Sequence, residues 1–316
     1  MHHFHNKCQL NQDYYSPYID YATTRIPFAI KPKNVEFGSK IDTMNATSTD
    51  SVTGFRNLRE LYLGLRECEA CPPLANGMPR FLFRAERDGY PNTFTSMDRH
   101  YHDQNLSLDA FDELEDITAF VMQQPFPDKK LIGREAGAFA QHYGLPTQIF
   151  DFTSSAKIAM FFAANLAKHT PPALGGNMAI LNVERALDAG CTIDDLRHHS
   201  YAKRSCMQSA YGMLYMGFNS EGFYCLKDPE IISKIGLAWC PFVHLENDVA
   251  FLNEIGVNMN ILSTEGDPFT GLAQEFIDEF VVSRGHLSQE AARILSINVP
   301  AVGRSQEENF KRWASA

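Results

Sequence analysis

The segment from Ala140 to Ala164, AQHYGLPTQIFDFTSSAKIAMFFAA, gathers hydrogen-bonding side chains around a short apolar run. These polar residues are Gln141, His142, Tyr143, Asp151, Thr153, Ser154 and Ser155. A buried polar group without a partner costs about 1–3 kcal/mol, so we expect these side chains to bind a ligand or one another. The sequence therefore predicts a functional site in this segment.

The same segment contains the elements that would position these groups. Gly144 ends a helix, and residues 147–152 have the composition of a buried strand. Residues 156–167 form an apolar helix that Thr153 or Ser154 can cap. A strand leading into a helix N-terminus presents backbone N–H groups beside hydroxyls, which suits an anion such as phosphate. The alternative is an ordinary junction whose hydroxyls only cap the helix.

A candidate anion-binding residue lies upstream, in the apolar run RFLFR. Strand alternation places Leu82 and Arg84 on one face, opposite Phe81 and Phe83. An arginine beside a pocket binds carboxylate or phosphate through its planar fork. Arg84 is therefore predicted to contact an anionic ligand. Asp151 could instead support this guanidinium structurally, because a carboxylate on an apolar strand needs a partner.

The whole segment resembles a known family. HYGLPTQIFDFTSSAKIAMFFA is similar to the central motif of the FRG domain family, and Phe83-Arg84-Ala85 resembles the Phe-Arg-Gly triplet that names it. Residues 95–99, TSMDR, stand where the family has a Pro-Ser-x-x-Arg element. The resemblance extends over residues 78–256. Departures are Ala85 for the family glycine, Gln148 for an arginine and Glu254 for a glutamine.

The order of an early arginine, a Thr/Ser strand and a late acid is also similar to the ADP-ribosyltransferase superfamily. This similarity implies that Glu254 and Arg84 are catalytic, with Glu254 orienting the ribose and activating the acceptor. It implies NAD as the substrate, with no metal. The implied NAD-binding residues are Arg84, Gln141, His142, Tyr143, Asp151, Thr153 and Ser154.

Two other functions use the same residues. The pocket could belong to a non-catalytic module that binds a nucleotide or nucleic acid, or to a hydrolase or nuclease with His142 as base and Asp151 as its orienter. Glu254 could also be an ordinary exposed residue of an amphipathic helix, and His142 a core histidine. Replacing Glu254 separates transferase from binding module, and replacing His142 tests the hydrolase.

FRG-like proteins resemble accessory proteins of bacteria and phages. The resemblance therefore implies an intracellular toxin or anti-phage effector whose acceptor is a protein or a nucleic acid. A toxin of this kind would need a neutralising antitoxin or chaperone. The Tyr-rich N-terminal arm and the acidic stretch at residues 109–116 are the candidate contacts.

Composition narrows the class of protein. The 316 residues carry a net charge of −10 and are 44% hydrophobic, as expected for a globular protein without a broad nucleic-acid-binding surface. No apolar run is long enough to cross a membrane, and no secretory signal is present, so we expect a cytoplasmic protein with reduced cysteines. Cys68 and Cys71 form a CxxC without a second ligand pair, so no metal is expected there.

Strands and helices do not alternate regularly, which predicts an α+β fold with a mixed sheet flanked by helices. We expect an arm and linker at residues 1–50, an FRG-like domain at 51–265, and a helical extension at 266–316 packed on the same core. Further expected helices are 58–65, 108–123, 133–143, 272–283 and 288–295. Further expected strands are 80–84, 178–183, 222–226, 237–243 and 297–300.

Overall fold

The centre of the protein is a six-stranded sheet with the order β4-β5-β2-β1-β3-β6. The computed structural model describes residues 55–87, 93–104, 106–124, 140–165, 175–198, 203–215, 225–245, 247–257 and 270–314. The strands are β1 (Phe81–Glu86), β2 (Phe150–Thr153), β3 (Gly175–Asn182), β4 (Cys191–Asp195), β5 (Ala210–Tyr215) and β6 (Leu237–Val243). The α+β class is confirmed, but all neighbouring strands are antiparallel where we expected a mixed sheet.

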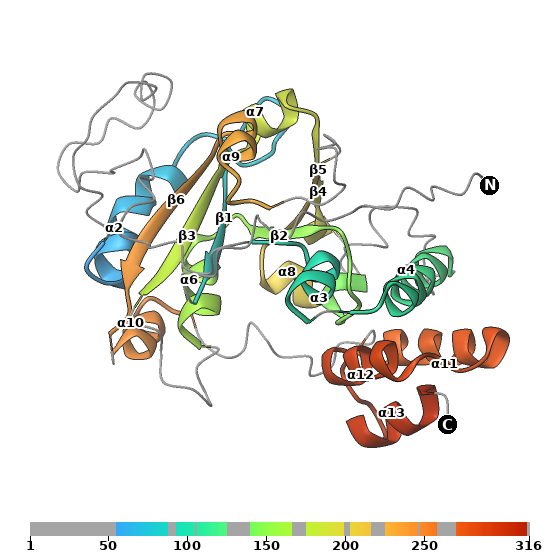
Figure 1. Ribbon diagram of the computed structural model, residues 1–316. Coiled ribbons are helices and arrows are strands. Elements are labelled where there is room, and N and C mark those ends of the chain that lie inside the picture. The colour runs from blue at the N-terminus through green and yellow to red at the C-terminus, as the bar shows by residue number, and fades with distance from the viewer. Residues whose placement is uncertain are drawn as a thin grey trace, which may run out of the picture.

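Helices cover both faces of the sheet (Figure 1). On one face, α2 (Leu58–Glu69), α6 (Ala156–Asn165) and α10 (Asp248–Glu254) share a hydrophobic cluster with Phe81 and Phe83. On the other face, α7 (Val183–Asp188) and α9 (Pro229–Ile235) pack over a cluster that contains Leu82. The alternation of side chains along β1 thus divides the core into two layers. Three short elements complete this part of the fold: α3 (Ser96–Gln104), the 3-10 helix η2 (Leu196–His198) and α8 (Lys203–Met207).

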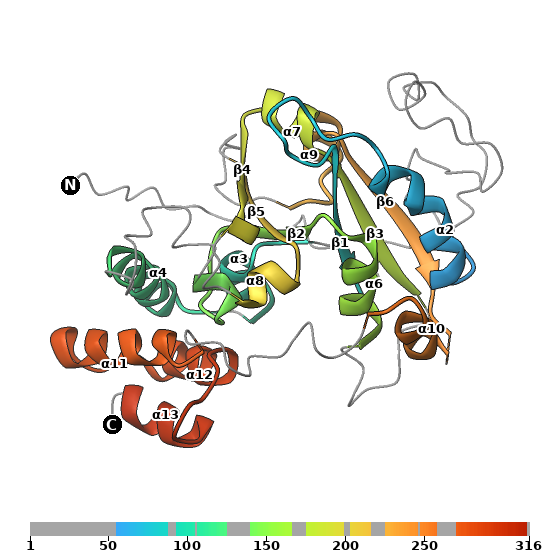
Figure 2. The ribbon, with the colours of Figure 1, turned by 180° about the vertical axis from the view of Figure 1, so that it is seen from behind.

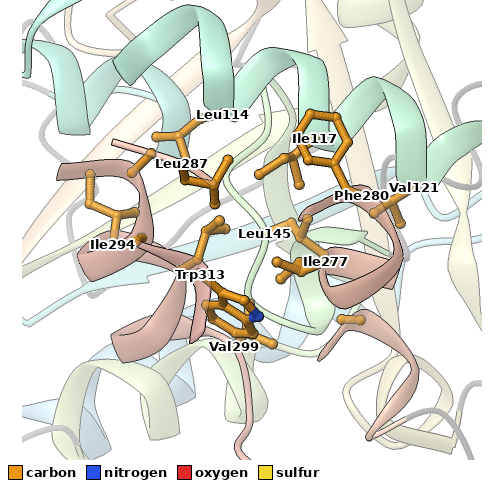
Figure 3. Packing of buried hydrophobic residues seen from close by; sticks show 14 of the residues in the cluster. Leu114, Ile117, Val121, Leu145, Ile277, Phe280, Leu287, Ile294, Val299 and Trp313 are labelled. Carbon is orange, nitrogen blue, oxygen red and sulfur yellow. The ribbon is translucent and has the colours of Figure 1, made fainter. Parts of the chain in front are cut away.

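The C-terminal helices form a separate group at one end of the molecule (Figures 1 and 2). They are α11 (Leu272–Arg284), α12 (Gln289–Asn298) and α13 (Gln306–Trp313), and they pack with α4 (Leu108–Gln123). Leu145, which follows the glycine of the central motif, lies among their buried side chains (Figure 3). The polar segment found in the sequence is thereby anchored to the C-terminal helices as well as to the sheet.

Several predicted elements have the expected bounds, notably α4 at 108–123 and β6 at 237–243. The predicted strand 147–152 begins only at Phe150, because the backbone of Thr147 bonds to α3 through Met97 N–H and the Ser96 hydroxyl. Cys225 and Leu226 lie in a turn where we predicted a strand. The strand predicted at 297–300 is also wrong, since α12 continues to Asn298.

Some predictions fall on residues outside the described ranges. These are the N-terminal arm at 1–50, most of the helix at 133–143, the last residues of the helix at 156–167, and residues 222–224. Among the helices of the described ranges, none combines the length and apolar character that crossing a membrane requires.

Candidate functional site

A pocket of about 330 Å³ lies where the central motif meets β1, α3 and the end of α12. Of the residues predicted to form the site, Arg84, Gln141 and Asp151 line it. The remaining lining residues are Phe94, Thr95, Ser96, Arg99, His100, Gly144, Leu145, Pro146, Ile149, Phe150 and Asn298. Four segments of the chain therefore share one cavity.

Arg84 bridges two strands that diverge at the pocket. The register between β1 and β2 consists of the single pair Phe83 and Thr153. One residue beyond it, Arg84 Nη1 donates a 3.0 Å hydrogen bond to the backbone carbonyl of Asp151. The guanidinium thus links the two strands at a point where backbone pairing between them has ended. Its Nε is buried without a hydrogen-bond partner in the described part of the chain.

Two residues that line the same pocket carry unpaired acceptors. Gln141 Nε2 donates to the carbonyl of Ile149 at 2.9 Å, which leaves Gln141 Oε1 as the unused end of the amide. Gln141 Oε1 and Asp151 Oδ1 are both buried and have no hydrogen-bond partner among the described residues. Each such atom costs about 1–3 kcal/mol, and native proteins keep such groups where a water or ligand completes the bond. The pocket therefore contains a preformed set of groups suited to a polar ligand.

His142 lies behind the pocket and does not line it. Burial lowers the pKa of His142, the Arg204 guanidinium lowers it further, and the Asp151 carboxylate and Gln208 oppose the shift. The imidazole is therefore neutral at neutral pH. Its Nε2 has no hydrogen-bond partner among the described residues. A buried ring outside the cavity lacks the contact with substrate that a general base needs.

The other polar residues of the motif support the site from within the core. Tyr143, an implied NAD-binding residue, is fully buried in the cluster formed with the C-terminal helices and does not line the pocket. The Thr153 hydroxyl donates to the carbonyl of Gln208 at 2.8 Å and accepts from Ser155 N–H at 3.1 Å. Ser154 N–H donates to the carbonyl of Ser209. These bonds fix β2 against the start of β5.

The predicted anion site at the N-terminus of α6 is already filled by a side chain. Ala156 N–H donates to Glu69 Oε1 at 2.7 Å, and Glu69 comes from the end of α2. A carboxylate at a helix N-terminus satisfies a free N–H and the positive end of the helix dipole. The carboxylate of a residue 87 positions upstream therefore binds this N–H, where the sequence suggested an anion such as phosphate.

Glu254 lies on α10, away from the pocket. Its side chain is 60% exposed and bonds to Arg59 Nη2 at 2.6 Å, while the Arg59 guanidinium also lies over the Phe251 ring. Helix α10 packs on α2 and α6, well apart from the C-terminal helices (Figure 2). The structure therefore does not bring Glu254 to the residues it was predicted to act with. The carboxylate that lines the pocket is Asp151.

The first turn of α3 lies in the TSMDR segment that resembles a family element, and it contributes a wall that the sequence analysis did not assign to the site. Thr95 accepts from Asp98 N–H at 3.2 Å and donates to Asp98 Oδ2 at 2.6 Å, which fixes the start of the helix. Arg99 and His100 follow on the same turn and line the pocket. The T-x-x-D spacing of a helix N-terminus was the available signal. Asn298 had no local signal, because only tertiary packing brings it there.

Of the CxxC pair, Cys68 is buried in the core and Cys71 is partly buried, and neither lines the pocket. Burial, with the nearby Cys71, Glu67 and Glu69, raises the pKa of the Cys68 thiol to about 12. Metal binding requires a thiolate, and burial disfavours it here. Within the described ranges, no group of three or more His, Cys, Asp or Glu side chains is arranged to hold a metal ion.

Comparison with known proteins identifies part of the chain. Residues 80–171 match the FRG domain family. Neither the curated proteins nor the solved structures contain a match to this chain. The FRG region includes Arg84, the first turn of α3, Gln141 and Asp151. Asn298 and Glu254 both lie outside it.

Proposed function

We propose that the pocket described above binds NAD and that the protein transfers ADP-ribose from this NAD to an acceptor. The observation that supports a ligand is the set of buried, unpaired polar atoms on Arg84, Gln141 and Asp151. These groups come from β1, the central motif and β2, yet they lie around one cavity. Their chemistry matches different parts of a dinucleotide.

The cationic wall suits the pyrophosphate. Arg84, Arg99 and His100 line the pocket, and the first turn of α3 adds the positive end of a helix dipole. Guanidinium groups bind phosphate through charge-assisted hydrogen bonds that are about twice as strong as neutral ones. We therefore assign the phosphates to the side of the pocket formed by β1 and α3.

The unpaired acceptors suit ribose hydroxyls. Gln141 Oε1 and Asp151 Oδ1 each need a donor, and a ribose diol offers two neighbouring O–H groups. An acidic residue that accepts from the ribose 2′-OH is a common feature of dinucleotide sites. A carboxylate at this position would also stabilise the positive charge that develops on the ribose.

In the proposed reaction the bond between ribose C1′ and the nicotinamide nitrogen breaks. Its electron pair leaves with nicotinamide, which becomes neutral. The acceptor nucleophile forms the new bond to C1′ and loses its proton to solvent. Asp151 takes the electrostatic role that the superfamily resemblance implied for Glu254, because Asp151 lines the pocket and Glu254 does not.

A second candidate function is a nucleotide-binding module without catalysis. The position of Glu254 favours this function, because the acid that the superfamily resemblance implied as catalytic lies outside the pocket. Among the described lining residues, Asp151 is the only carboxylate. The two functions share the ligand and differ in whether nicotinamide is released. One experiment can therefore separate them.

The test measures NAD binding by calorimetry and nicotinamide release by chromatography for the purified full chain. Asp151→Asn and Glu254→Gln form a matched pair, since each converts one acid to its amide. We expect Asp151→Asn to lower release at least 100-fold, a typical effect of removing one transition-state-stabilising group. Glu254→Gln should keep both activities.

Binding without release in the wild-type protein would favour the non-catalytic module. A folded wild-type protein that does not bind NAD would overturn both functions. Loss of release in Glu254→Gln, with release intact in Asp151→Asn, would return the catalytic role to Glu254.

The cellular role that we propose is that of an intracellular toxin or anti-phage effector, neutralised by an antitoxin or chaperone. Its support is the resemblance of the FRG region to accessory proteins of bacteria and phages. The acceptor is a protein or a nucleic acid. Growth arrest on induction of the wild-type gene, absent with Asp151→Asn, is the expected result. Normal growth at the same expression level would contradict it.

A further inference from the structure

The pocket has a wall that does not come from the FRG region. Asn298, the last residue of α12, lines the cavity next to the central motif. The backbone carbonyl of Asn298 lies directly against Gly144, so the end of α12 and the motif are in contact. Its neighbours Ile294 and Val299 are buried among the C-terminal helices around Trp313 (Figure 3). Asn298 is therefore held on a rigid support.

The carboxamide of Asn298 is itself oriented. Asn298 Nδ2 donates to the backbone carbonyl of Ile294 at 2.8 Å. This bond uses one of the two amide hydrogens and leaves the second, together with Oδ1 as an acceptor. The remaining donor and acceptor belong to the same planar group. Such a pair forms two parallel hydrogen bonds with a complementary edge on a ligand.

The charge distribution across the pocket favours one orientation of the bound ligand. The wall formed by α3 carries Arg99 and the positive end of a helix dipole, whereas Asn298 marks the C-terminal, negative end of α12. Phosphate is favoured on the α3 wall and disfavoured at α12. A neutral group with one donor and one acceptor is favoured beside Asn298.

We propose that Asn298 is a specificity-determining residue that pairs with the donor–acceptor edge of a heterocycle on the bound nucleotide. This inference rests on the proposed function, because it assumes NAD in the pocket. NAD has two such groups, the amino edge of adenine and the carboxamide of nicotinamide. Both offer an N–H donor beside an acceptor, so the chemistry is shared and experiment distinguishes the source.

The test compares dissociation constants of NAD for wild-type protein, Asn298→Ala and the control Asn253→Ala. Asn253 is an exposed asparagine on α10, outside the pocket. Loss of a two-bond contact should weaken NAD binding about tenfold in Asn298→Ala and leave Asn253→Ala unchanged. Circular dichroism and thermal unfolding of each variant check that it folds.

Two analogues test the same point on the wild-type protein. Replacing adenine by hypoxanthine removes the amino group, and replacing nicotinamide by nicotinic acid removes the carboxamide. We expect one analogue to bind about tenfold more weakly than NAD, which identifies the edge that Asn298 recognises. That difference should disappear in Asn298→Ala.

Wild-type binding of NAD that is unchanged by Asn298→Ala and equal for both analogues would overturn the inference and leave the proposed function intact. An analogue difference that persists in Asn298→Ala would also overturn it. A wild-type protein that binds none of the three dinucleotides would overturn the proposed function, and this inference with it.

Discussion

Gly144 packs against the backbone carbonyl of Asn298 with no room for a side chain. A β-carbon at Gly144 would lie 2.0 Å from the Asn298 carbonyl oxygen, and Gly144 has a φ of +92°. The residue is therefore constrained twice, by a backbone conformation that favours glycine and by a contact with rigid backbone. This contact joins the central motif to the C-terminal helices at the pocket.

We predict that Gly144→Ala lowers the free energy of unfolding by about 3 kcal/mol, from backbone strain together with overpacking. Gly190→Ala is the matched control, because Gly190 has a φ of +88° and nothing within 4 Å of an added β-carbon. The control should lose only about 1 kcal/mol from the positive φ. Urea unfolding measures both variants. Equal losses would show that the contact with Asn298 has no energetic effect.

Helices α4 and α12 cap each other. Ser107 at the start of α4 donates through both its N–H and its hydroxyl to Glu290 of α12. Ser288 at the start of α12 donates in the same way to Glu113 of α4. We predict that Ser288→Ala lowers stability by about 1 kcal/mol, as for loss of a helix N-cap.

Combining Ser288→Ala with Glu113→Ala tests whether the two residues act as a pair. The double variant should be less destabilised than the sum of the single variants, by at least about 0.5 kcal/mol. Chemical denaturation of all four proteins gives this coupling energy. Strict additivity would mean that the serine and the glutamate contribute independently.

Asp278 of α11 connects this helix to α13 and to the segment that precedes α13. Its carboxylate accepts from Arg304 Nη1 and Nη2, from Arg312 Nε and from the indole N–H of Trp313. Burial on its own would raise the pKa of Asp278, but the hydrogen bonds from Arg304 and Trp313 and the two positive charges hold it below its usual value. The folded protein therefore favours the ionised form more than the unfolded chain does.

A depressed pKa stabilises the fold above the pKa of the unfolded chain, and this stabilisation is lost as the pH falls through the folded-state value. We predict that the wild-type protein loses stability at acidic pH partly through Asp278. At neutral pH, the free energy of unfolding of Asp278→Asn should be about 1.5–3 kcal/mol lower than that of the wild-type protein. It should also decrease less as the pH is lowered. Denaturant unfolding between neutral and acidic pH measures both. Parallel profiles would contradict this role.

The cysteines should differ sharply in reactivity. Burial raises the pKa of Cys68 and of Cys240 to about 12, whereas Cys206 is exposed on α8. At pH 8 a thiol with that pKa is ionised in roughly one molecule in ten thousand, and the thiolate is the reactive form.

Cys8 lies outside the described residues, so the experiment uses a Cys8→Ser background. In this background we predict that Cys206 reacts first with a chromogenic disulfide reagent. Cys68 and Cys240 should react only when the protein is unfolded in denaturant. Peptide mapping after timed labelling identifies the modified residue. Fast labelling of Cys68 in the native protein would show that its end of α2 opens readily.

Local sequence patterns predicted the elements that have a clear period or end signal. The 3.6-residue pattern of α4 and the apolar run of β6 gave their bounds directly. Strands β4 and β5 were missed. β5 is buried along most of its length, and the β4 residues CTIDD carry little strand pattern. In such segments pairing with neighbouring strands decides the structure, and pairing partners are not visible locally.

The sequence by itself determined which polar side chains of the central motif and of β1 need partners, because polar groups are costly to bury alone, and it predicted that Arg84, Gln141 and Asp151 form a site. The structure places these three residues around one pocket. Only the tertiary structure decided what surrounds them. It placed Glu69 on the N-terminus of α6, Asn298 at the pocket and Glu254 on a distant helix. Burial cost is a property of one residue, whereas proximity depends on how distant segments pack.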